Sequence, residues 1–267
     1  MYETWSEYHF KKISHTRIIN IKSRYEVHLS KLDNINICDL KIKDVQELYD
    51  NLPLASGTAN QVKSILKMIF DFAIRNEYID KNPADFIELR KHQLVIERKT
   101  FTDEEIAFLW DNITLELVDT VLIMIYTGMR IEEFLNLKIE NINLEERYCI
   151  AGSKTEAGKD RLIPLHYKIL PLVIKRFKIG NTYLVTYNNK KMTYPTYRRA
   201  FLKLMENLKF NHTIHDCRHT FATLMSNAEA NPVSIAKIIG HKDYRITGKI
   251  YTHKDKNELI KAIDMIN

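Results

Sequence analysis

The sequence of 267 residues contains little of what interrupts regular structure, with seven glycines and six prolines in the whole chain. This scarcity excludes collagen-like and low-complexity architectures. The chain also lacks an apolar run approaching the ~20 residues of a membrane-spanning helix, and its N-terminus lacks the basic and apolar regions of a signal peptide. With 45% hydrophobic and 28% charged residues, the composition excludes a disordered chain. We therefore expect a soluble, cytoplasmic protein with no membrane partner.

Cysteine is scarce as well. The three cysteines, Cys38, Cys149 and Cys217, are an odd number and show no pairing pattern. We interpret them as free thiols in a reducing compartment.

Charge is distributed unevenly along the chain, whose formal net charge is +6. Residues 1–98 carry a net charge of +1, residues 99–146 carry −8, and residues 147–267 carry +13 from 22 basic and 9 acidic side chains. A basic C-terminal surface indicates a polyanionic partner, of which nucleic acid is the commonest. Charge alone is equally compatible with a solvated, lysine-rich surface.

Helical periodicity dominates residues 1–89. The clearest apolar stripe lies in 56–79 and consists of Val62, Ile65, Leu66, Ile69, Phe70, Ala73 and Ile74, at spacings of three and four. Residues 90–100, with the sequence RKHQLVIERKT, are polar and aperiodic, which is typical of an interdomain linker. The sequence thus predicts a helical domain at 1–89, a linker at 90–100 and a second domain at 101–267.

The second domain is expected to mix helices with a few strands. Two short strands are predicted at 147–151 and 161–165, joined by a loop with a glycine near each end, and a third at 182–187. Helices are predicted at 102–112, 116–127, 130–138, 193–208, 215–227, 232–239, 243–251 and 255–265. The predicted fold class is therefore mainly α with a small β-sheet (α+β), in which a helical domain precedes a mixed α/β domain.

The first candidate functional motif is Thr127–Leu137, where an apolar helix ends at Gly128 and Arg130 opens the next helix. An arginine anchored at such a junction can present its guanidinium fork to an oxyanion, with Glu133 one turn further on to orient it. The alternative is a purely structural ion pair between Arg130 and Glu133.

The second motif begins at His215. His215 and Arg218 are three residues apart and share one helical face, a combination suited to a phosphate group, and His219 follows directly. The competing interpretation is a zinc site, because His212, His215 and His219 lie at spacings of three and four. Arg218 would then place a fixed positive charge among the ligands, so we expect no metal.

The third motif comprises His241 and Tyr251. His241 follows the predicted helix C-cap at Gly240, where the chain turns and the side chain can be directed outward. Tyr251 comes ten residues later and is one of 14 tyrosines, so its residue type alone does not distinguish it from a core aromatic.

Together these motifs resemble the tyrosine recombinase family, the integrases of phages and mobile elements. The resemblance depends on a set in fixed order: arginine in TGxRxxE, lysine in a strand-connecting turn, HxxRH, GH and YTH. The chain supplies Arg130, Lys154, His215, Arg218, His241 and Tyr251, with Glu133 and His219 as supporting residues. The C-terminal segment is covered closely, and the N-terminal bundle more loosely through Asn82-Pro83-Ala84, which is similar to the close of the family's core-binding domain.

The resemblance implies a site-specific DNA recombinase or integrase that cleaves and rejoins double-stranded DNA through a 3′-phosphotyrosyl intermediate, for integration or excision of a mobile element or phage. Arg130 and Arg218 would clamp phosphate oxygens, and His241 would add a further donor. Because a phosphotyrosine conserves the bond energy, neither ATP nor a metal nor another cofactor is expected.

Proton transfers follow from the same resemblance. In the family the lysine of the strand-connecting turn, here Lys154, is the general acid for the leaving 5′ oxygen. His215 would assist proton transfer at Tyr251, since a phenol with an ordinary pKa near 10 needs help to attack at neutral pH.

The final predicted helix, 255–265, carries an apolar stripe that includes Leu259, Ile260 and Ile263. In the family such a helix docks on a neighbouring protomer, which implies a homotetramer on two DNA sites; packing within its own chain is the alternative. Two other functions remain open: a catalytically inert DNA-binding regulator of the same fold, and a type IB topoisomerase-like DNA-relaxing enzyme.

Overall fold

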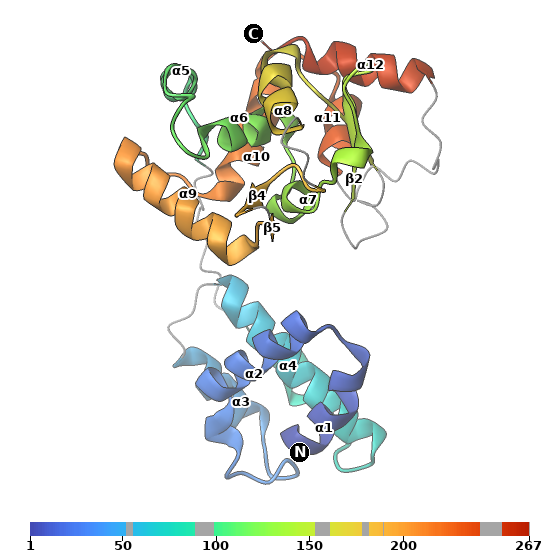
Figure 1. Ribbon diagram of the computed structural model, residues 1–267. Helices are drawn as coiled ribbons and strands as arrows, with labels where there is room; N and C mark the ends of the chain where they lie inside the picture. The colour runs from blue at the N-terminus through green and yellow to red at the C-terminus, as the bar shows by residue number, and fades with distance from the viewer. Residues whose placement is uncertain are drawn as a thin grey trace. The chain divides into compact units, whose positions relative to one another are not determined.

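A computed structural model of the protein describes residues 1–51, 56–88, 99–152, 161–177, 182–188, 190–240 and 253–266. The chain forms two compact units, Met1–Ile96 and Glu97–Asn267 (Figure 1). Most of the predicted linker, 90–100, lies outside the described residues, so the predicted domain limits stay a prediction.

The described part of unit 1 is built from helices. They are α1 (Tyr2–His9), the 3-10 helix η1 (Phe10–Lys12), α2 (His15–His28), η2 (Ser30–Leu32), α3 (Ile42–Asp50), α4 (Ser56–Arg75) and η3 (Pro83–Phe86). The apolar stripe predicted for α4 lies in the core of the unit, with Val62, Ile65 and Phe70 buried while Lys67 is exposed.

The Asn-Pro turn that follows α4 is tied back to that helix. The buried Asn82 donates from Nδ2 to the Lys67 carbonyl at 3.2 Å and to Asp71 Oδ1 at 2.6 Å. Its Oδ1 accepts from the Ala84 backbone N–H at 2.9 Å, which caps η3. One amide side chain therefore caps η3 and fastens it to the side of α4.

Unit 2 combines helices with two small antiparallel sheets, which confirms the predicted α+β fold class. Its elements are α5 (Asp103–Asp111), α6 (Val118–Thr127), α7 (Ile131–Leu135), η4 (Ile139–Asn141), β1 (Ile142–Asn143), β2 (Tyr148–Ala151), β3 (Arg161–Pro164), η6 (Tyr167–Ile169), α8 (Leu170–Phe177), β4 (Thr186–Tyr187), β5 (Lys190–Lys191), α9 (Tyr194–Leu208), α10 (Ile214–Asn227), α11 (Pro232–Ile239) and α12 (His253–Ile263). The larger sheet has the order β1-β2-β3, with Ala151 opposite Arg161.

Helix α6 occupies the centre of unit 2, where it packs against α10 (Figure 1). Every residue of α6 except Asp119 is buried, as expected for a helix that is apolar on all sides. Despite this, none of the helices in the described part of the chain combines the length and the apolar character needed to cross a membrane.

Several helix boundaries confirm local sequence signals. Thr102 and Glu105 form the predicted capping box at the start of α5. Asn231 caps α11 by accepting from the Val233 N–H at 2.8 Å, and Gly240 ends that helix with a φ of +72°. These signals depend on neighbouring residues only, which is why the sequence reveals them.

Other boundaries differ from the prediction. The helix predicted at 130–138 ends at Leu135, and of the strand predicted at 182–187 the structure contains 186–187. Helix α8 and strands β1 and β5 were not predicted, while the helix predicted at 243–251 lies outside the described residues.

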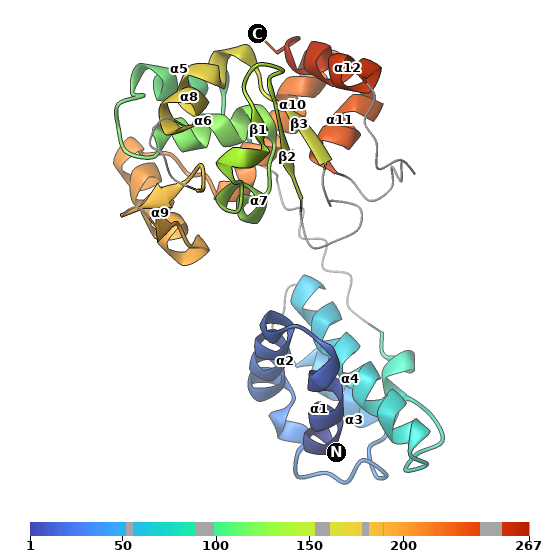
Figure 2. The ribbon, with the colours of Figure 1, turned by 45° about the vertical axis from the view of Figure 1, so that its right-hand side comes forward.

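Helix α12 packs within its own unit, against β3 and α11 (Figure 2). Leu259 and Ile263 are buried there. The Asp264 carboxylate that follows the helix binds the Arg147 guanidinium at 2.7 and 3.0 Å. In the single chain, then, the apolar face of α12 is covered in cis.

Candidate active site

The junction between α6 and α7 places Arg130. Helix α6 ends at Gly128, whose φ is +61°, and a Cβ added there would lie 2.4 Å from Cδ1 of Phe221 on α10. Glycine is therefore required both by the backbone conformation and by the contact between the two helices. Two residues later Arg130 is the N-cap of α7, so its position is set by a closely packed turn.

The Glu133 carboxylate binds two arginines. Its side chain is 1% exposed. It accepts from Arg130 Nη1 at 2.9 Å and, through both oxygens, from Arg161 Nη1 and Nη2 at 2.7 and 2.6 Å. It also accepts from the Arg130 backbone N–H at 2.9 Å. Burial alone would raise the pKa of Glu133, but the hydrogen bonds and charge of Arg161, together with Arg130, outweigh burial and hold that pKa below its ordinary value.

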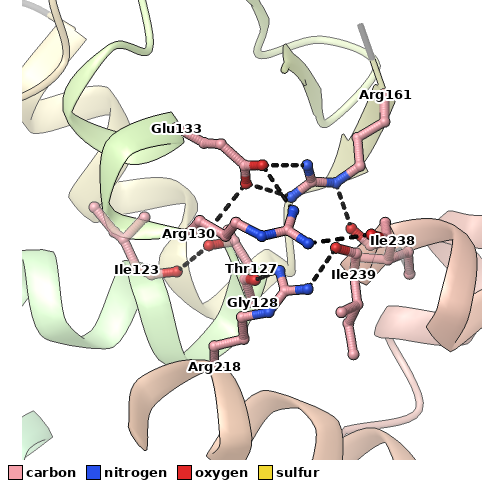
Figure 3. A network of polar contacts seen from close by, with 10 residues as sticks. Ile123, Thr127, Gly128, Arg130, Glu133, Arg161, Arg218, Ile238 and Ile239 are labelled. Atoms are coloured by element: carbon pink, nitrogen blue, oxygen red, sulfur yellow. Dashed lines mark hydrogen bonds and ion pairs between the residues drawn. The ribbon is translucent and has the colours of Figure 1, made fainter. Parts of the chain in front are cut away.

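Three arginines meet the C-terminal end of α11 (Figure 3). Arg161 Nε donates to the Ile238 carbonyl at 2.8 Å, Arg218 Nη2 to the Ile239 carbonyl at 2.7 Å, and Arg130 Nη2 to the Gly240 carbonyl at 3.2 Å. The last carbonyls of a helix have no partner within it and carry its negative dipole end, which favours cations there. We refer to Arg130, Glu133, Arg161 and Arg218 as the arginine cluster.

Arg218 differs from the other two arginines because backbone carbonyls are its only hydrogen-bond acceptors in the described part of the chain. It projects from α10, is 8% exposed, and donates from Nη1 to the Gly128 carbonyl at 2.7 Å in addition to its bond to α11. Burial, followed by the positive charges of Arg130 and Arg161, lowers the pKa of Arg218 to about 9. It therefore remains protonated at neutral pH.

The charges of the arginine cluster do not balance. The cluster holds three guanidinium groups but one carboxylate, that of Glu133, which leaves a local surplus of positive charge among the described residues. A buried charge is costly unless it is paired. The cluster is thus suited to an anion, and the side chain of Arg130, 40% exposed, is the member accessible from solvent.

His215 and His219 lie beside Arg218 on α10. Their ring centroids are 4.6 Å apart, with the rings nearly perpendicular. His215 is exposed, and partial burial, followed by the positive fields of His219 and Arg218, lowers its pKa from the ordinary 6.5. His215 is therefore neutral at pH 7 and can accept a proton.

His212 does not join these two histidines. Its Nε2 lies 2.9 Å from Glu105 Oε2, and its ring stacks on Phe101 with centroids 3.9 Å apart. Within the described ranges there is no group of three or more histidine, cysteine or acidic side chains that could hold a metal ion. The structure thus gives the zinc interpretation of His212, His215 and His219 no support among these residues.

The structure therefore brings together Arg130, Glu133, His215, Arg218 and His219 of the predicted site. Lys154, His241 and Tyr251 lie outside the described residues.

Sequence reasoning missed Arg161. It begins the strand β3, and its partners are far away along the chain. The available signal is indirect: the residues after it are apolar, so an arginine at the start of such a buried strand needs a partner.

The sequence and the fold are similar to those of known proteins. Residues 99–258 match the Phage integrase family. The chain is similar to the tyrosine recombinase XerD of Staphylococcus aureus, with 26% identity over 91% of this chain and 86% of the relative.

Two solved structures share the fold. One is the Tn1549 transposon integrase in complex with circular intermediate DNA, with a TM-score of 0.76, 22% identity and 96% of each chain covered. The other is a lambda integrase tetramer bound to a Holliday junction, with a TM-score of 0.75, 17% identity, and 92% of this chain and 78% of that chain covered. Because the family match spans more than half of the sequence, the chain belongs to the phage integrase family, the tyrosine-type site-specific DNA recombinases.

Proposed function

We propose that this chain cuts and rejoins double-stranded DNA at specific sites, with Tyr251 forming a transient covalent bond to the DNA 3′-phosphate. The observation that carries the proposal is the charge surplus of the arginine cluster, which contains three guanidinium groups and one carboxylate. A phosphodiester is an anion with two non-bridging oxygens, and fork-shaped guanidinium donors fit this geometry.

Arg130 and Arg218 stabilise the charge that develops on the phosphate. Each donates to a non-bridging oxygen while Tyr251 Oη attacks the phosphorus in line. The bond from phosphorus to the 5′ oxygen breaks, and Lys154 donates a proton to that oxygen. Attack by the 5′ hydroxyl of another DNA end reverses the step, restores a phosphodiester and frees Tyr251.

His215 takes the proton of the Tyr251 phenol. Its lowered pKa leaves it neutral at pH 7 and thus able to accept a proton. His241 donates a further hydrogen bond to the phosphate. His219 supports His215, because the two rings are in edge-to-face contact. The number of phosphate ester bonds is conserved in each step, so the reaction needs no ATP.

A second basic surface in unit 2 supports DNA as the partner. Helix α9 exposes Arg198, Arg199 and Lys203 beside Tyr194. Basic side chains grouped on one helix neutralise phosphates of a nucleic acid without reading its sequence. This surface lies in the segment of the chain that carries a net charge of +13.

We also propose that the protein works as a homotetramer on two DNA sites, assembled through α12. Support comes from the similarity to the lambda integrase, whose tetramer is bound to a Holliday junction. Because the apolar face of α12 is covered in cis, docking on a neighbour requires that protomers exchange this helix. Light scattering of the complex with a paired-site DNA should give four chains; two chains or fewer would contradict the proposal.

Covalent capture on DNA tests the catalytic proposal. The protein first selects a binding sequence from a randomised duplex library. A duplex with this sequence is then nicked close to the cleavage position. Cleavage thus releases a short fragment that carries the free 5′ hydroxyl, and its departure prevents the reverse reaction. We expect the wild type to form a covalent protein–DNA adduct that survives denaturing electrophoresis, whereas Tyr251→Phe forms none.

The matched control is Tyr187→Phe, which removes the hydroxyl of an exposed tyrosine in the same unit and should leave capture unchanged. Adduct formation by Tyr251→Phe at the wild-type level would overturn the proposal. Binding of the selected duplex by a wild type that never forms an adduct would instead indicate an inert DNA-binding regulator.

A further inference from the structure

Arg161 is a charged residue in a place that favours apolar ones. All four residues of β3 are buried, and the Arg161 side chain is 4% exposed. Its guanidinium nevertheless makes three hydrogen bonds, two to the Glu133 carboxylate on α7 and one to the Ile238 carbonyl on α11. Arg161 thus connects the sheet with α7 and α11.

The contacts of Arg161 determine how Glu133 meets Arg130. A bidentate guanidinium fixes the plane of a carboxylate, because both oxygens must lie in the plane of the fork. With that plane fixed, Oε1 of Glu133 receives Arg130 Nη1 and Oε2 receives the Arg130 backbone N–H, both at 2.9 Å. The direction of the Arg130 guanidinium therefore depends on a residue that Arg130 does not itself hydrogen-bond in the described structure.

The same side chain also fixes the end of α11. Its Nε bond to Ile238 comes just before Gly240, and a Cβ added to Gly240 would lie 3.2 Å from Cδ of Arg161. The last turn of α11 thus rests directly on the arginine stem.

We propose that Arg161 is a positioning residue for DNA cleavage: through Glu133 it directs Arg130 at the scissile phosphate, and through Ile238 it anchors the end of α11. This inference rests on the proposed function. Arg161 is treated as a positioning residue and not a catalytic one because each of its three guanidinium nitrogens donates to a protein acceptor, two of them to the Glu133 carboxylate, and its side chain is 4% exposed. A solely structural ion pair, by contrast, would affect folding and not the rate of the folded enzyme.

Arg161→Lys separates positioning from charge. Lysine keeps the positive charge beside Glu133 but cannot form the planar fork. At saturating selected duplex we expect the single-turnover rate of covalent capture to fall about 10²-fold, the cost of a misplacement near 1 Å. The dissociation constant for the uncleaved duplex should change less than about threefold, since binding relies mainly on contacts to other phosphates.

The matched control is Arg176→Lys. Arg176 makes a similar bidentate pair in the same unit, with Asp119 at 2.6 and 2.7 Å and both side chains mostly buried, but it belongs to no candidate site. We expect it to lower the melting temperature about as much as Arg161→Lys while the capture rate stays within about threefold of wild type. Equal capture rates for Arg161→Lys and Arg176→Lys would overturn the inference.

A double-mutant cycle identifies the route of the effect. If Arg161 acts through Arg130, the double variant Arg130→Lys, Arg161→Lys should capture DNA less than about threefold more slowly than Arg130→Lys alone. If Arg161→Lys slows capture as much in the Arg130→Lys variant as it does in the wild type, the two residues act independently and the inference is overturned. Lack of any Tyr251-dependent adduct from the wild type would instead remove the proposed function itself, and the inference with it.

Discussion

Unit 2 uses its arginines in two different ways. Arg176 and Arg147 each bind one carboxylate fork to fork, Arg176 with Asp119 and Arg147 with Asp264. In the arginine cluster, Arg130 and Arg161 share the Glu133 carboxylate, whereas Arg218 donates only to backbone carbonyls in the described part of the chain.

The paired arginines attach elements of the fold to one another, whereas the arginine cluster is suited to binding a ligand. The paired arginines fasten α8 to α6 and the end of α12 to the residue that precedes β2, and their charges are neutralised by their partners. Carbonyl groups satisfy the hydrogen-bonding capacity of Arg218 but carry only partial charge, so they leave its positive charge available to a ligand. Changes to the two groups should therefore affect different properties of the protein.

The largest contrast is expected between Arg218→Gln and Arg176→Gln. Arg218→Gln removes a donor to the phosphate and should slow covalent capture about 10³-fold. It leaves no carboxylate unpaired, so the free energy of unfolding should fall by about 1 kcal/mol. Arg176→Gln strands the mostly buried Asp119 and should cost about 3 kcal/mol of stability. Urea unfolding and single-turnover capture measure the two effects.

The comparison would fail if both variants lost activity in proportion to stability. Capture by Arg176→Gln should be measured well below its unfolding midpoint, so that an unfolded fraction does not reduce the rate. Under those conditions its rate should stay near the wild-type rate.

The two glycines that border the cluster should differ in the same way. Gly128→Ala drives a Cβ to 2.4 Å from the rigid Phe221 ring at a φ of +61°, and should lower the free energy of unfolding by about 3 kcal/mol through strain and overpacking. Gly240→Ala meets the flexible Arg161 stem at 3.2 Å and should cost about 1 kcal/mol. Urea titration compares the two.

The capture rate refines this prediction. Because Gly240→Ala displaces Arg161, it should slow capture more than its small stability loss explains. A Gly240→Ala variant with wild-type capture would mean that the position of the Arg161 stem is unimportant for cleavage.

The smallest effect concerns acid stability. The pKa of Glu133 in the folded protein is held below its ordinary 4.5, so its stabilising contribution is complete above pH 4.5 and disappears as pH falls through the folded-state pKa. In Glu133→Gln the free energy of unfolding should therefore fall less steeply below pH 4.5 than in the wild type. The difference in slope is at most that of one bound proton, about 1.4 kcal/mol per pH unit. Thermal unfolding from pH 3 to 6 measures the slopes, and identical slopes would contradict the prediction.

The fold was predictable where signals are local. The buried stripe of α4, the capping box of α5 and the glycine ends of α6 and α11 all depend on residues within one or two turns. Strands β1 and β5 contain two residues each, too few for an alternating pattern. Helix α8 has eight residues and includes Pro171, so its helical period is short and its composition resembles a loop.

The candidate site was predictable in part for the same reason. Arg130, His215 and Arg218 lie in motifs that resemble a family, whereas Arg161 has no motif of its own. Its partners Glu133 and Ile238 are 28 and 77 positions away along the chain, and only folding brings the three together. A buried arginine whose partners are distant leaves no local pattern to detect.

The end of α11 provides acceptors that do not depend on side-chain identity. Ile238, Ile239 and Gly240 are consecutive, and each offers its carbonyl to a different arginine. Successive helical residues are rotated by about 100°, so one inserted or deleted residue would redirect all three acceptors at once. During evolution, substitution of the apolar side chains at 238 and 239 therefore leaves these carbonyl acceptors in place, whereas the number of residues that lead to this turn is constrained.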